Sequence, residues 1–429
     1  MASESFCPLP WVHQATYTDG SALLCCVAEN ASGQNLNRTS FRESWNSKHW
    51  KKVRQQMMNG EKPAACKRCW VEEGNGYRSH RQTELGVWQA RLGVDALEKM
   101  LSETEADGSF QTPPKSIDLR LGNTCNLQCV MCRPHDSSKW IGLAKKMSLT
   151  AESPAIRDDL SYKLKLKSDD FNWQERAEIW DELVEFLPDL RELIIGGGEP
   201  MLLEQHFRFL ERCVSSGHAE HIQLRYHTNL TVLPAEVLPL WQKFKFVEVF
   251  ASIDALGDMN HYVRHPAKWQ DIERHLRLLD TMNFEKVRTM ILSSVHFLTF
   301  FDLDQLLGWI QEQKFKTVTH GYNGHIHPGI VMSPEYLSVQ AYPVALKKAI
   351  ATKITAFEAG SHKRSNKIQG VLNYMMERDQ TSRLPATMDY IRQLDTARGT
   401  NFRSTFLELC TALTAAGVLA RDKSDFLNV

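Results

Sequence analysis

Short apolar runs alternate with amphipathic stretches through the middle of this chain, and that alternation restricts its possible folds more than any other feature. Six runs have the length and residue types of strands, and they cover residues 116–121, 193–195, 222–226, 247–253, 287–294 and 317–322. Helical apolar patterns lie between or after them, at residues 180–187, 204–214, 234–243, 269–282 and 303–313. Because strand–helix units in series build a parallel sheet, the chain is predicted to have an α/β fold, either an open doubly wound sheet or an incomplete barrel.

Different patterns flank this core. Thr112-Pro113-Pro114 is a candidate linker, and a helix is predicted before it at residues 90–101. Residues 334–429 have helical patterns and no strand pattern, whereas residues 133–171 form a polar insertion whose fold the sequence does not predict. The predicted domains are therefore a cysteine-rich domain at 1–82, a helix and linker at 83–112, the α/β core at 113–330 and a helical C-terminal region at 331–429.

Composition narrows the class of protein. Apolar residues make up 42% of the 429 residues and charged residues 24%, as in globular proteins. Because 51 basic residues balance 51 acidic ones, overall charge does not favour nucleic acid as a partner, although it does not exclude it. No apolar run approaches the roughly 20 residues of a membrane helix, and residues 1–7 lack the features of a signal peptide. We therefore expect a cytoplasmic protein with no membrane partner.

Eight of the ten cysteines lie in clusters within the first 132 residues. In the reducing cytoplasm, clustered thiols are metal ligands or catalytic groups more often than disulfides. Cys213 and Cys410 stand alone in helical apolar patterns and are predicted to be buried core thiols. The clustered cysteines are therefore the candidate metal ligands.

The first candidate site is a loop directly after the first predicted strand, with cysteines at positions 125, 129 and 132. Active-site loops of parallel α/β folds follow the carboxyl ends of strands, so the location suits chemistry. A full protein ligand set for an iron–sulfur cluster is four cysteines, and three leave one iron open to an outside ligand. The competing interpretation is structural zinc completed by His135, but zinc sites usually contain paired C-x2-C knuckles.

The loop resembles the signature of the radical S-adenosylmethionine (SAM) superfamily, and later motifs agree with this resemblance. Gly196-Gly197-Gly198-Glu199-Pro200 resembles the family's GGE motif, which receives the amino group of the methionine part of SAM. Other positions resemble the family's contacts to the ribose, adenine and carboxylate of the cofactor. The resemblance thus implies that SAM is bound by Met131, Gly197, Gly198, Glu199, Thr228, Asn229, Ser252, Asp254 and Arg264.

The resemblance also implies a partial (β/α)6 radical SAM barrel and its chemistry. Cys125, Cys129 and Cys132 are expected to hold a four-iron four-sulfur cluster, and SAM is expected to chelate the open iron. One-electron cleavage of SAM would give a 5′-deoxyadenosyl radical, which abstracts a hydrogen atom from the substrate. An external low-potential donor of the flavodoxin or ferredoxin type would supply the electron.

A second group of cysteines precedes the barrel. Asp19-Gly20 predicts a hairpin turn that brings Cys25 and Cys26 back toward Cys7. Adjacent strand residues point to opposite faces, so only one cysteine of this pair is expected to face the same metal. The predicted ligand set is Cys7, Cys25, Cys66 and Cys69, with Cys26 as the alternative to Cys25. On chemistry alone, four thiolates suit structural zinc and an iron–sulfur cluster equally.

The spacing C-x12-G-x4-C, from Cys7 through Gly20 to Cys25, resembles the opening of SPASM and twitch auxiliary-cluster domains. In those families the domain usually follows the barrel, whereas here it precedes it. That order resembles twitch-domain-containing radical SAM proteins, as do Asn172-Trp173, residues 262–269, Leu394-Asp395 and Arg398-Gly399. The resemblance implies a second iron–sulfur cluster, of the four-iron four-sulfur type, whose first-ranked role is to relay an electron from the substrate radical.

The substrate is the least constrained part of the hypothesis. His320 and Tyr322, at the end of the sixth predicted strand, are predicted substrate contacts. The resemblance favours a peptide or protein residue as the substrate, and an enzyme that modifies RNA or a small metabolite is the alternative. A non-enzymatic interaction protein stapled by zinc is the alternative from a different class.

Overall fold

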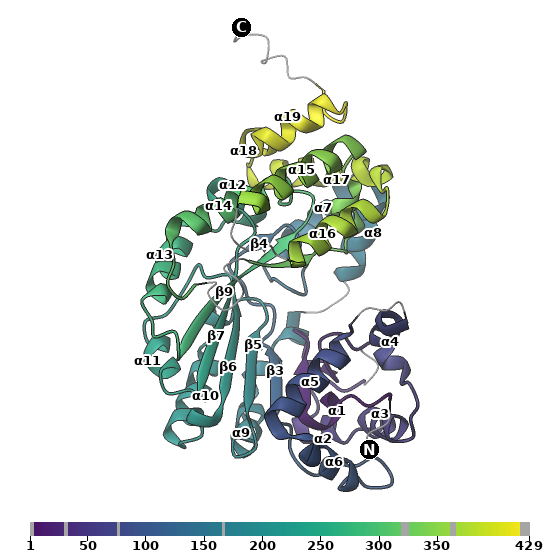
Figure 1. Cartoon of the computed structure of the whole chain (residues 1–429), viewed down its shortest axis with the longest axis vertical. Coiled ribbons are helices and arrows are strands. Elements are labelled where there is room, and N and C mark those ends of the chain that lie inside the picture. The colour runs from purple at the N-terminus through teal and green to yellow at the C-terminus, as the bar shows by residue number, and fades with distance from the viewer. Residues whose placement is uncertain are drawn as a thin grey trace. The chain divides into compact units, whose positions relative to one another are not determined.

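The computed structural model describes residues 4–29, 33–74, 78–164, 168–318, 326–360 and 366–420 (Figure 1). The chain forms two compact units. The first contains Met1–Thr124, Lys167–His227 and Ala235–Val247, and the second contains Cys125–Leu166, Thr228–Pro234 and Glu248–Val429. Each helix in the described part of the chain is too short or too polar to span a bilayer.

The strands form one large sheet and one small one. They are β1 (His13–Thr16), β2 (Ala22–Leu23), β3 (Ser116–Arg120), β4 (Gln128–Cys129), β5 (Glu192–Gly196), β6 (Gln223–Thr228), β7 (Phe246–Ser252), β8 (Arg264–His265), β9 (Val287–Val295) and β10 (His327–Ile330). The large sheet has the order β10-β9-β7-β6-β5-β3-β1-β2, and β4 pairs with β8. Strands β3, β5 and β6 are parallel neighbours. The predicted α/β fold is thus confirmed, with β3, β5, β6, β7 and β9 at predicted strand positions.

The N-terminal cysteine-rich segment adds strands to this same sheet, which the sequence does not predict. Strand β1 pairs antiparallel with β2 around the turn at Gly20, whose φ of 80° fits the Asp-Gly turn signal. On its other side β1 pairs parallel with β3, with Gln14 opposite Ile117. All four residues of β1 are buried, so neither face of this strand is open to water.

The sheet beyond β9 differs from the sequence prediction. The sixth predicted strand, residues 317–322, is described only as far as Val318, which forms an isolated parallel bridge with Thr289. Strand β10 pairs parallel with β9, with Gly329 opposite Ser294. Because β10 contains Pro328 and Gly329, two residue types that are depleted in strands, its local sequence does not predict it.

Helices of the first unit surround the hairpin and the strands of that unit. They are α1 (Leu9–Val12), α2 (Phe41–Trp45), α3 (Lys48–Met58), α4 (Lys67–Gly74), α5 (His80–Leu92), α6 (Val94–Ser102), α9 (Ala177–Glu185), α10 (Glu204–Ser215) and α11 (Val237–Trp241), with short 3₁₀ turns η1 (Ala64–Cys66), η2 (Ser168–Phe171), η3 (Trp173–Glu175), η4 (Pro200–Leu202) and η5 (Ala219–His221). The predicted helix at 90–101 is wrong in one respect. It is divided into α5 and α6 at Gly93, whose φ of 84° is incompatible with a continuous helix.

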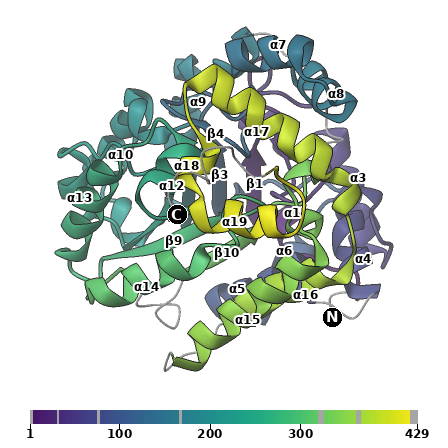
Figure 2. The same cartoon turned by 90° about the horizontal axis from the view of Figure 1, so that it is seen from above.

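Helices of the second unit include the predicted helical C-terminal region. They are α7 (Trp140–Thr150), α8 (Pro154–Lys163), α12 (Gly257–Val263), α13 (Trp269–Asp280), α14 (Leu303–Gln313), α15 (Val344–Gly360), α16 (Asn366–Glu377), α17 (Leu384–Arg398), α18 (Phe402–Thr405) and α19 (Leu407–Ala415), with η6 (Glu335–Leu337), η7 (Val339–Ala341) and η8 (Thr381–Arg383). The insertion at 133–171, for which no fold was predicted, contains α7 and α8. Figure 2 shows α17 beside both of them, and all three helices are in contact.

Candidate active site and auxiliary metal site

The loop with the first three cysteines is anchored by the small sheet. Strand β4 pairs antiparallel with β8, which places Cys129 opposite Arg264. The amide of Val130 donates to the carbonyl of Val263, and the amide of Cys132 donates to the carbonyl of Cys129. Cys125 and Cys129 are 9% and 5% exposed, and Cys132 is half-buried. The loop therefore presents three shielded thiols on a short, hydrogen-bonded stretch of backbone.

Hydrogen bonding shifts the pKa values of Cys129 and Cys132 in opposite directions. A bond from Cys132 lowers the pKa of Cys129, against the effect of burial, and the Arg264 guanidinium lowers it further. The same bond, together with burial, raises the pKa of Cys132 well above its usual value. At the start of the loop, Asn229 Nδ2 lies 3.9 Å from Cys125 Sγ. One thiol of the Cys129–Cys132 pair is thus favoured as thiolate, the form that binds metal.

A buried ion pair lies next to Cys129. Arg264 contacts Asp254 through one edge of its guanidinium, at 2.7 Å from Nε to Oδ2 and 3.0 Å from Nη2 to Oδ1. Its Nη1 is 3.8 Å from Cys129 Sγ. Burial would lower the pKa of Arg264, but the Asp254 carboxylate raises it overall. Sequence reasoning assigned both residues to SAM. Here they bind each other, and a contact from either to SAM stays a prediction.

The other predicted SAM residues of the second unit surround the cysteine loop or end a strand. Asn229 donates from Nδ2 to Asn126 Oδ1 at 2.9 Å, and its Oδ1 accepts from the amide and hydroxyl of Thr231. Thr228 Oγ1 accepts from the amide of Leu230 at 3.0 Å. Met131 is half-buried beside Cys132, and Ser252 is the half-buried last residue of β7. The structure brings Asn229 to the cysteine loop through Asn126 and Cys125.

The glycine motif of the first unit follows β5 and lies against the backbone that leads into the cysteine loop. A Cβ at Gly197 would lie 2.7 Å from the amide nitrogen of Leu121, and one at Gly198 would lie 2.2 Å from the carbonyl oxygen of Thr124. The amide of Glu199 donates to that same Thr124 carbonyl at 2.8 Å. Glycine is therefore required for backbone packing, a reason that sequence analysis did not give. The fully buried Glu199 carboxylate accepts from the amide of Met201.

The predicted substrate contacts His320 and Tyr322 lie outside the described residues. Sequence reasoning missed other residues around the cysteine loop, namely Ser137, Arg133, Trp140 and Tyr390. Their side chains donate to the carbonyls of Leu127, Cys132, Cys129 and Val130, respectively. Arg133, Ser137 and Trp140 follow Cys132 closely in the sequence, whereas Tyr390 lies 260 positions from its partner and has no local signal.

The second cysteine group converges on one pocket of the first unit. The pocket is lined by Cys7, Leu9, Cys25, Val27, Ala28, Cys66, Cys69, His80 and Arg81. Burial raises the pKa of Cys7, and the neighbouring Cys25, Cys66 and Cys69 raise it further because thiolates repel one another. Cys26 is exposed, with its Sγ 3.9 Å from His80 Nε2, and does not line this pocket. The geometry thus places Cys25, and not Cys26, beside the other three thiols.

Arg81 contributes positive charge to the pocket, a role that sequence analysis did not predict. Arg81 lines it and is held by Phe6, whose carbonyl accepts from Nη1 at 2.7 Å, and by an ion pair with Glu73 at 2.7 Å. Its guanidinium lowers the pKa of Cys66, although burial and Cys69 raise that pKa to about 12. The only signal for this role is the position of Arg81 shortly after the C-x2-C knuckle.

The glycine of the C-x12-G-x4-C spacing has a packing role. A Cβ at Gly20 would lie 3.0 Å from Cδ1 of Trp173. The indole Nε1 of Trp173 donates to the carbonyl of Thr18 at 3.2 Å. The hairpin between Cys7 and Cys25 is therefore fixed by a tryptophan more than 150 positions away, and only glycine leaves room for it.

The number of thiols in each group fits the ligand set of an iron–sulfur cluster. Cys7, Cys25, Cys66 and Cys69 line one pocket, and four cysteines are a full protein ligand set. Cys125, Cys129 and Cys132 are one thiol fewer, which leaves one iron open to a cofactor.

Comparisons with known proteins match a family model to each of the two regions that contain these cysteines. Residues 119–310 match the family model of the radical SAM superfamily, and residues 7–70 match that of the SPASM iron–sulfur cluster-binding domain. No curated protein matches the chain.

Two groups of solved structures are similar. Native anSMEcpe with bound AdoMet has 18% sequence identity and a TM-score of 0.38, over 61% of this chain and 66% of that chain. Streptococcus suis SuiB bound to precursor peptide SuiA has 13% identity and a TM-score of 0.35, over 69% of this chain and 59% of that chain. The alignment therefore spans less than two thirds of the length of either structure.

Proposed function

The chain belongs to the radical SAM superfamily and carries an iron–sulfur cluster-binding SPASM domain at its N-terminus, and on this premise we propose that it abstracts a hydrogen atom from a residue of a peptide or protein. It is an enzyme whose cofactors are SAM and iron–sulfur clusters, as its motifs predict. The observation that carries the proposal is a radical SAM domain whose cysteine loop supplies three thiols, one fewer than a cluster can accept.

In the proposed mechanism, the chain's residues hold and shield the reacting groups. When bound, the cluster and SAM supply a 5′-deoxyadenosyl radical. We assign Cys125, Cys129 and Cys132 to the cluster, where the Arg264 guanidinium favours the Cys129 thiolate. Asn229 donates toward Cys125 Sγ and holds that thiol in place. The remaining assigned SAM contacts are Met131, Gly197, Gly198, Glu199, Thr228, Ser252 and Asp254.

For the second site, we assign Cys7, Cys25, Cys66 and Cys69 to an auxiliary four-iron four-sulfur cluster. A cluster bound there would supply an acceptor for one electron of the substrate radical, which would also release a proton, so that the substrate would be oxidised by two electrons overall. The Arg81 guanidinium in the lining favours negative charge in the pocket, which suits an electron acceptor. An external donor of the flavodoxin or ferredoxin type remains the proposed source of the electron that cleaves SAM.

The substrate class rests on the presence of the auxiliary domain and on charge. The SPASM match supports the resemblance to auxiliary-cluster enzymes on which the peptide hypothesis is based. The balance of 51 basic and 51 acidic residues supports a peptide over RNA, because RNA recognition relies on clustered positive charge. We therefore propose a peptide or protein residue as the hydrogen donor.

The first experiment tests SAM cleavage. Anaerobically purified protein, given dithionite and SAM, should release 5′-deoxyadenosine, measured by liquid chromatography. Cys129→Ala should abolish the release, whereas Cys213→Ala, which alters a buried thiol of α10 outside both clusters, should retain it. Release by Cys129→Ala at the rate of the unaltered protein would disprove the assigned ligand set.

The second experiment tests the substrate class. Peptide, RNA and small-metabolite fractions from cells grown in heavy water are each added to the same reaction, and the mass of 5′-deoxyadenosine is measured. The peptide fraction should transfer deuterium, and transfer from the RNA or metabolite fraction alone would overturn the peptide assignment. Cys66→Ala should keep 5′-deoxyadenosine release and lose conversion of the peptide. Full conversion of the peptide by this variant would contradict the proposed role of the auxiliary cluster as an electron acceptor.

A further inference from the structure

Backbone carbonyls of the cysteine loop accept hydrogen bonds from side chains of two separate segments, residues 133–140 and helix α17. Ser137 Oγ donates to Leu127 at 2.6 Å, and Trp140 Nε1 donates to Cys129 at 2.9 Å. Arg133 donates to Cys132 at 2.7 Å. Helix α17 supplies the remaining two donors, since Tyr390 donates to Val130 at 2.7 Å and Arg398 donates to Gln128.

Helix α17 is fixed in this position by aromatic packing. The ring of Tyr390 stacks on the indole of Trp140, with centroids 6.5 Å apart and an interplanar angle of 5°. The Arg398 guanidinium lies 5.4 Å from the centroid of the same indole. Both donors of α17 therefore contact the loop directly and also contact Trp140, which is itself bonded to the loop. The helical C-terminal region thus forms part of the immediate surroundings of the cysteines.

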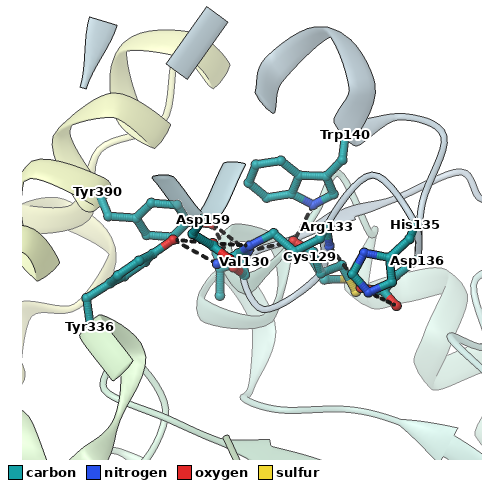
Figure 3. A network of polar contacts seen from close by, with 10 residues as sticks. Cys129, Val130, Arg133, His135, Asp136, Trp140, Asp159, Tyr336 and Tyr390 are labelled. Atoms are coloured by element: carbon teal, nitrogen blue, oxygen red, sulfur yellow. Dashed lines mark hydrogen bonds and ion pairs between the residues drawn. The ribbon is translucent and has the colours of Figure 1, made fainter. Parts of the chain in front are cut away.

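Arg133 and Arg398, the two arginines that donate to carbonyls of the loop, differ in how their charge is balanced. Figure 3 shows Arg133 among Tyr336, Tyr390 and Asp159, and its Nε lies 2.7 Å from an Asp159 carboxylate oxygen. The described hydrogen bonds of Arg398 instead go to neutral carbonyls, those of Gln128 and, at 3.4 Å, of Tyr262, and the nearby Asp395 carboxylate has only a secondary effect on its pKa. Burial lowers the pKa of Arg398. For the same reason, water screens the charge of this side chain poorly.

We propose that Tyr390 and Arg398 are positioning residues for the iron–sulfur loop, and that the Arg398 guanidinium raises the reduction potential of the cluster which that loop holds. Reduction adds an electron to the cluster, and a nearby cation stabilises the added negative charge. Hydrogen bonds to the loop carbonyls keep the thiols in one arrangement. The proposal rests on the assigned ligands Cys125, Cys129 and Cys132.

The effect of charge is tested on the reconstituted holoenzyme by an EPR-monitored redox titration. Arg398→Gln removes the charge but retains a hydrogen-bond donor, and it should move the midpoint potential of the SAM-binding cluster to a more negative value. Arg398→Lys keeps the charge and should stay near the unaltered protein. Arg392→Gln is the matched control, because Arg392 is an exposed arginine of the same helix that pairs with Glu152 and Asp389. Equal midpoint potentials for Arg398→Gln and Arg392→Gln would overturn the proposal that the Arg398 charge raises the reduction potential.

Positioning is tested on the apoprotein by hydrogen–deuterium exchange, so the result does not depend on cluster assembly. Tyr390→Phe should speed amide exchange at Val130 and Cys132, because the loop loses one anchor. Tyr336→Phe is the matched control, since Tyr336 is also buried but its hydroxyl bonds Arg133 and Asp159 and no loop carbonyl. Equal exchange for the two variants would overturn the positioning role. If Cys125→Ala still binds the SAM-responsive cluster, the assignment of the cluster ligands is wrong. The exchange experiment on the apoprotein does not depend on that assignment, so it still decides whether α17 anchors the loop.

Discussion

Arg264 and Asp254 form a buried ion pair through two contacts, of 2.7 and 3.0 Å. Asp254 is fully buried and its Oδ1 also accepts from the amide of Ser294 at 2.6 Å, so this carboxylate joins β9 to the arginine that lies beside Cys129. A charge that loses its partner in such a place is left in a medium that solvates it poorly. The pair therefore links the stability of the second unit to the electrostatics of the cysteine loop.

Asp254→Asn should lower the free energy of unfolding of the apoprotein by about 3–5 kcal/mol, because it leaves the Arg264 charge without its counterion. Urea denaturation followed by circular dichroism measures the change. Glu204→Gln provides the control, since it breaks an exposed pair with Arg208 in α10 and should cost less than about 1 kcal/mol. If both variants lose the same stability, the ion pair is not the structural link inferred here.

His296 predicts a pH dependence of stability. Burial, and then the nearby Arg264 charge, lower its pKa to about 3, and its Nδ1 accepts from the amide of Leu298 at 3.2 Å. The unfolded chain binds a proton at this residue near pH 6.5, whereas the folded chain binds it only near pH 3. The unfolded state therefore holds more protons between these values, and stability falls as the pH is lowered from about 6.5 toward 3.

We expect His296→Asn, which keeps an acceptor for the Leu298 amide, to reduce the loss of stability between pH 7 and pH 5. The measurement is the unfolding midpoint in urea at pH 7 and pH 5, compared between the variant and the unaltered protein. The same substitution at His221, an exposed residue, is the control. A slope between the two pH values that His296→Asn leaves unchanged would contradict the assignment.

The sequence predicts a structural feature when the residues that determine it lie close together in the chain. The turn at Gly20 depends on a few neighbouring residues, and the structure confirms it. The spacing of Cys125, Cys129 and Cys132 is equally local, and the role of these residues as cluster ligands stays a prediction. Strand β10 owes its pairing to β9 and contains Pro328 and Gly329, so no local pattern indicates it. The contact of Tyr390 with the loop joins residues 260 positions apart.

Glycines illustrate the same limit within the candidate site. The sequence identifies Gly197 and Gly198 as members of a motif and suggests that a ligand approaches their backbone. The structure gives a further reason, because backbone atoms of Leu121 and Thr124 occupy the space that a Cβ would need. A motif shows which residue types are required, but the atoms that require them become visible only in three dimensions.

Gly20 offers a direct test of such a requirement. Gly20→Ala should destabilise the protein by about 1–2 kcal/mol from the backbone at φ 80°, and by more because the added Cβ meets Trp173 at 3.0 Å. Gly33→Ala separates the two causes, since Gly33 has a φ of 65° but nothing lies within 4 Å of its Cβ position. Urea unfolding should therefore show a larger loss for Gly20→Ala, and equal losses would exclude the clash with the indole.

The last prediction concerns the choice between Cys25 and Cys26. Because Cys25 lines the pocket with Cys7, Cys66 and Cys69, whereas Cys26 is exposed beside His80, only Cys25→Ala should remove a ligand of the auxiliary cluster. Iron and acid-labile sulfide analysis of the reconstituted protein should show that Cys25→Ala loses about half of its iron, the share of one of two similar clusters. Cys26→Ala should retain nearly all of it. The two substitutions remove the same atom from adjacent positions. Loss of iron from Cys26→Ala alone would reverse the assignment, and loss from neither would place the cluster on other ligands.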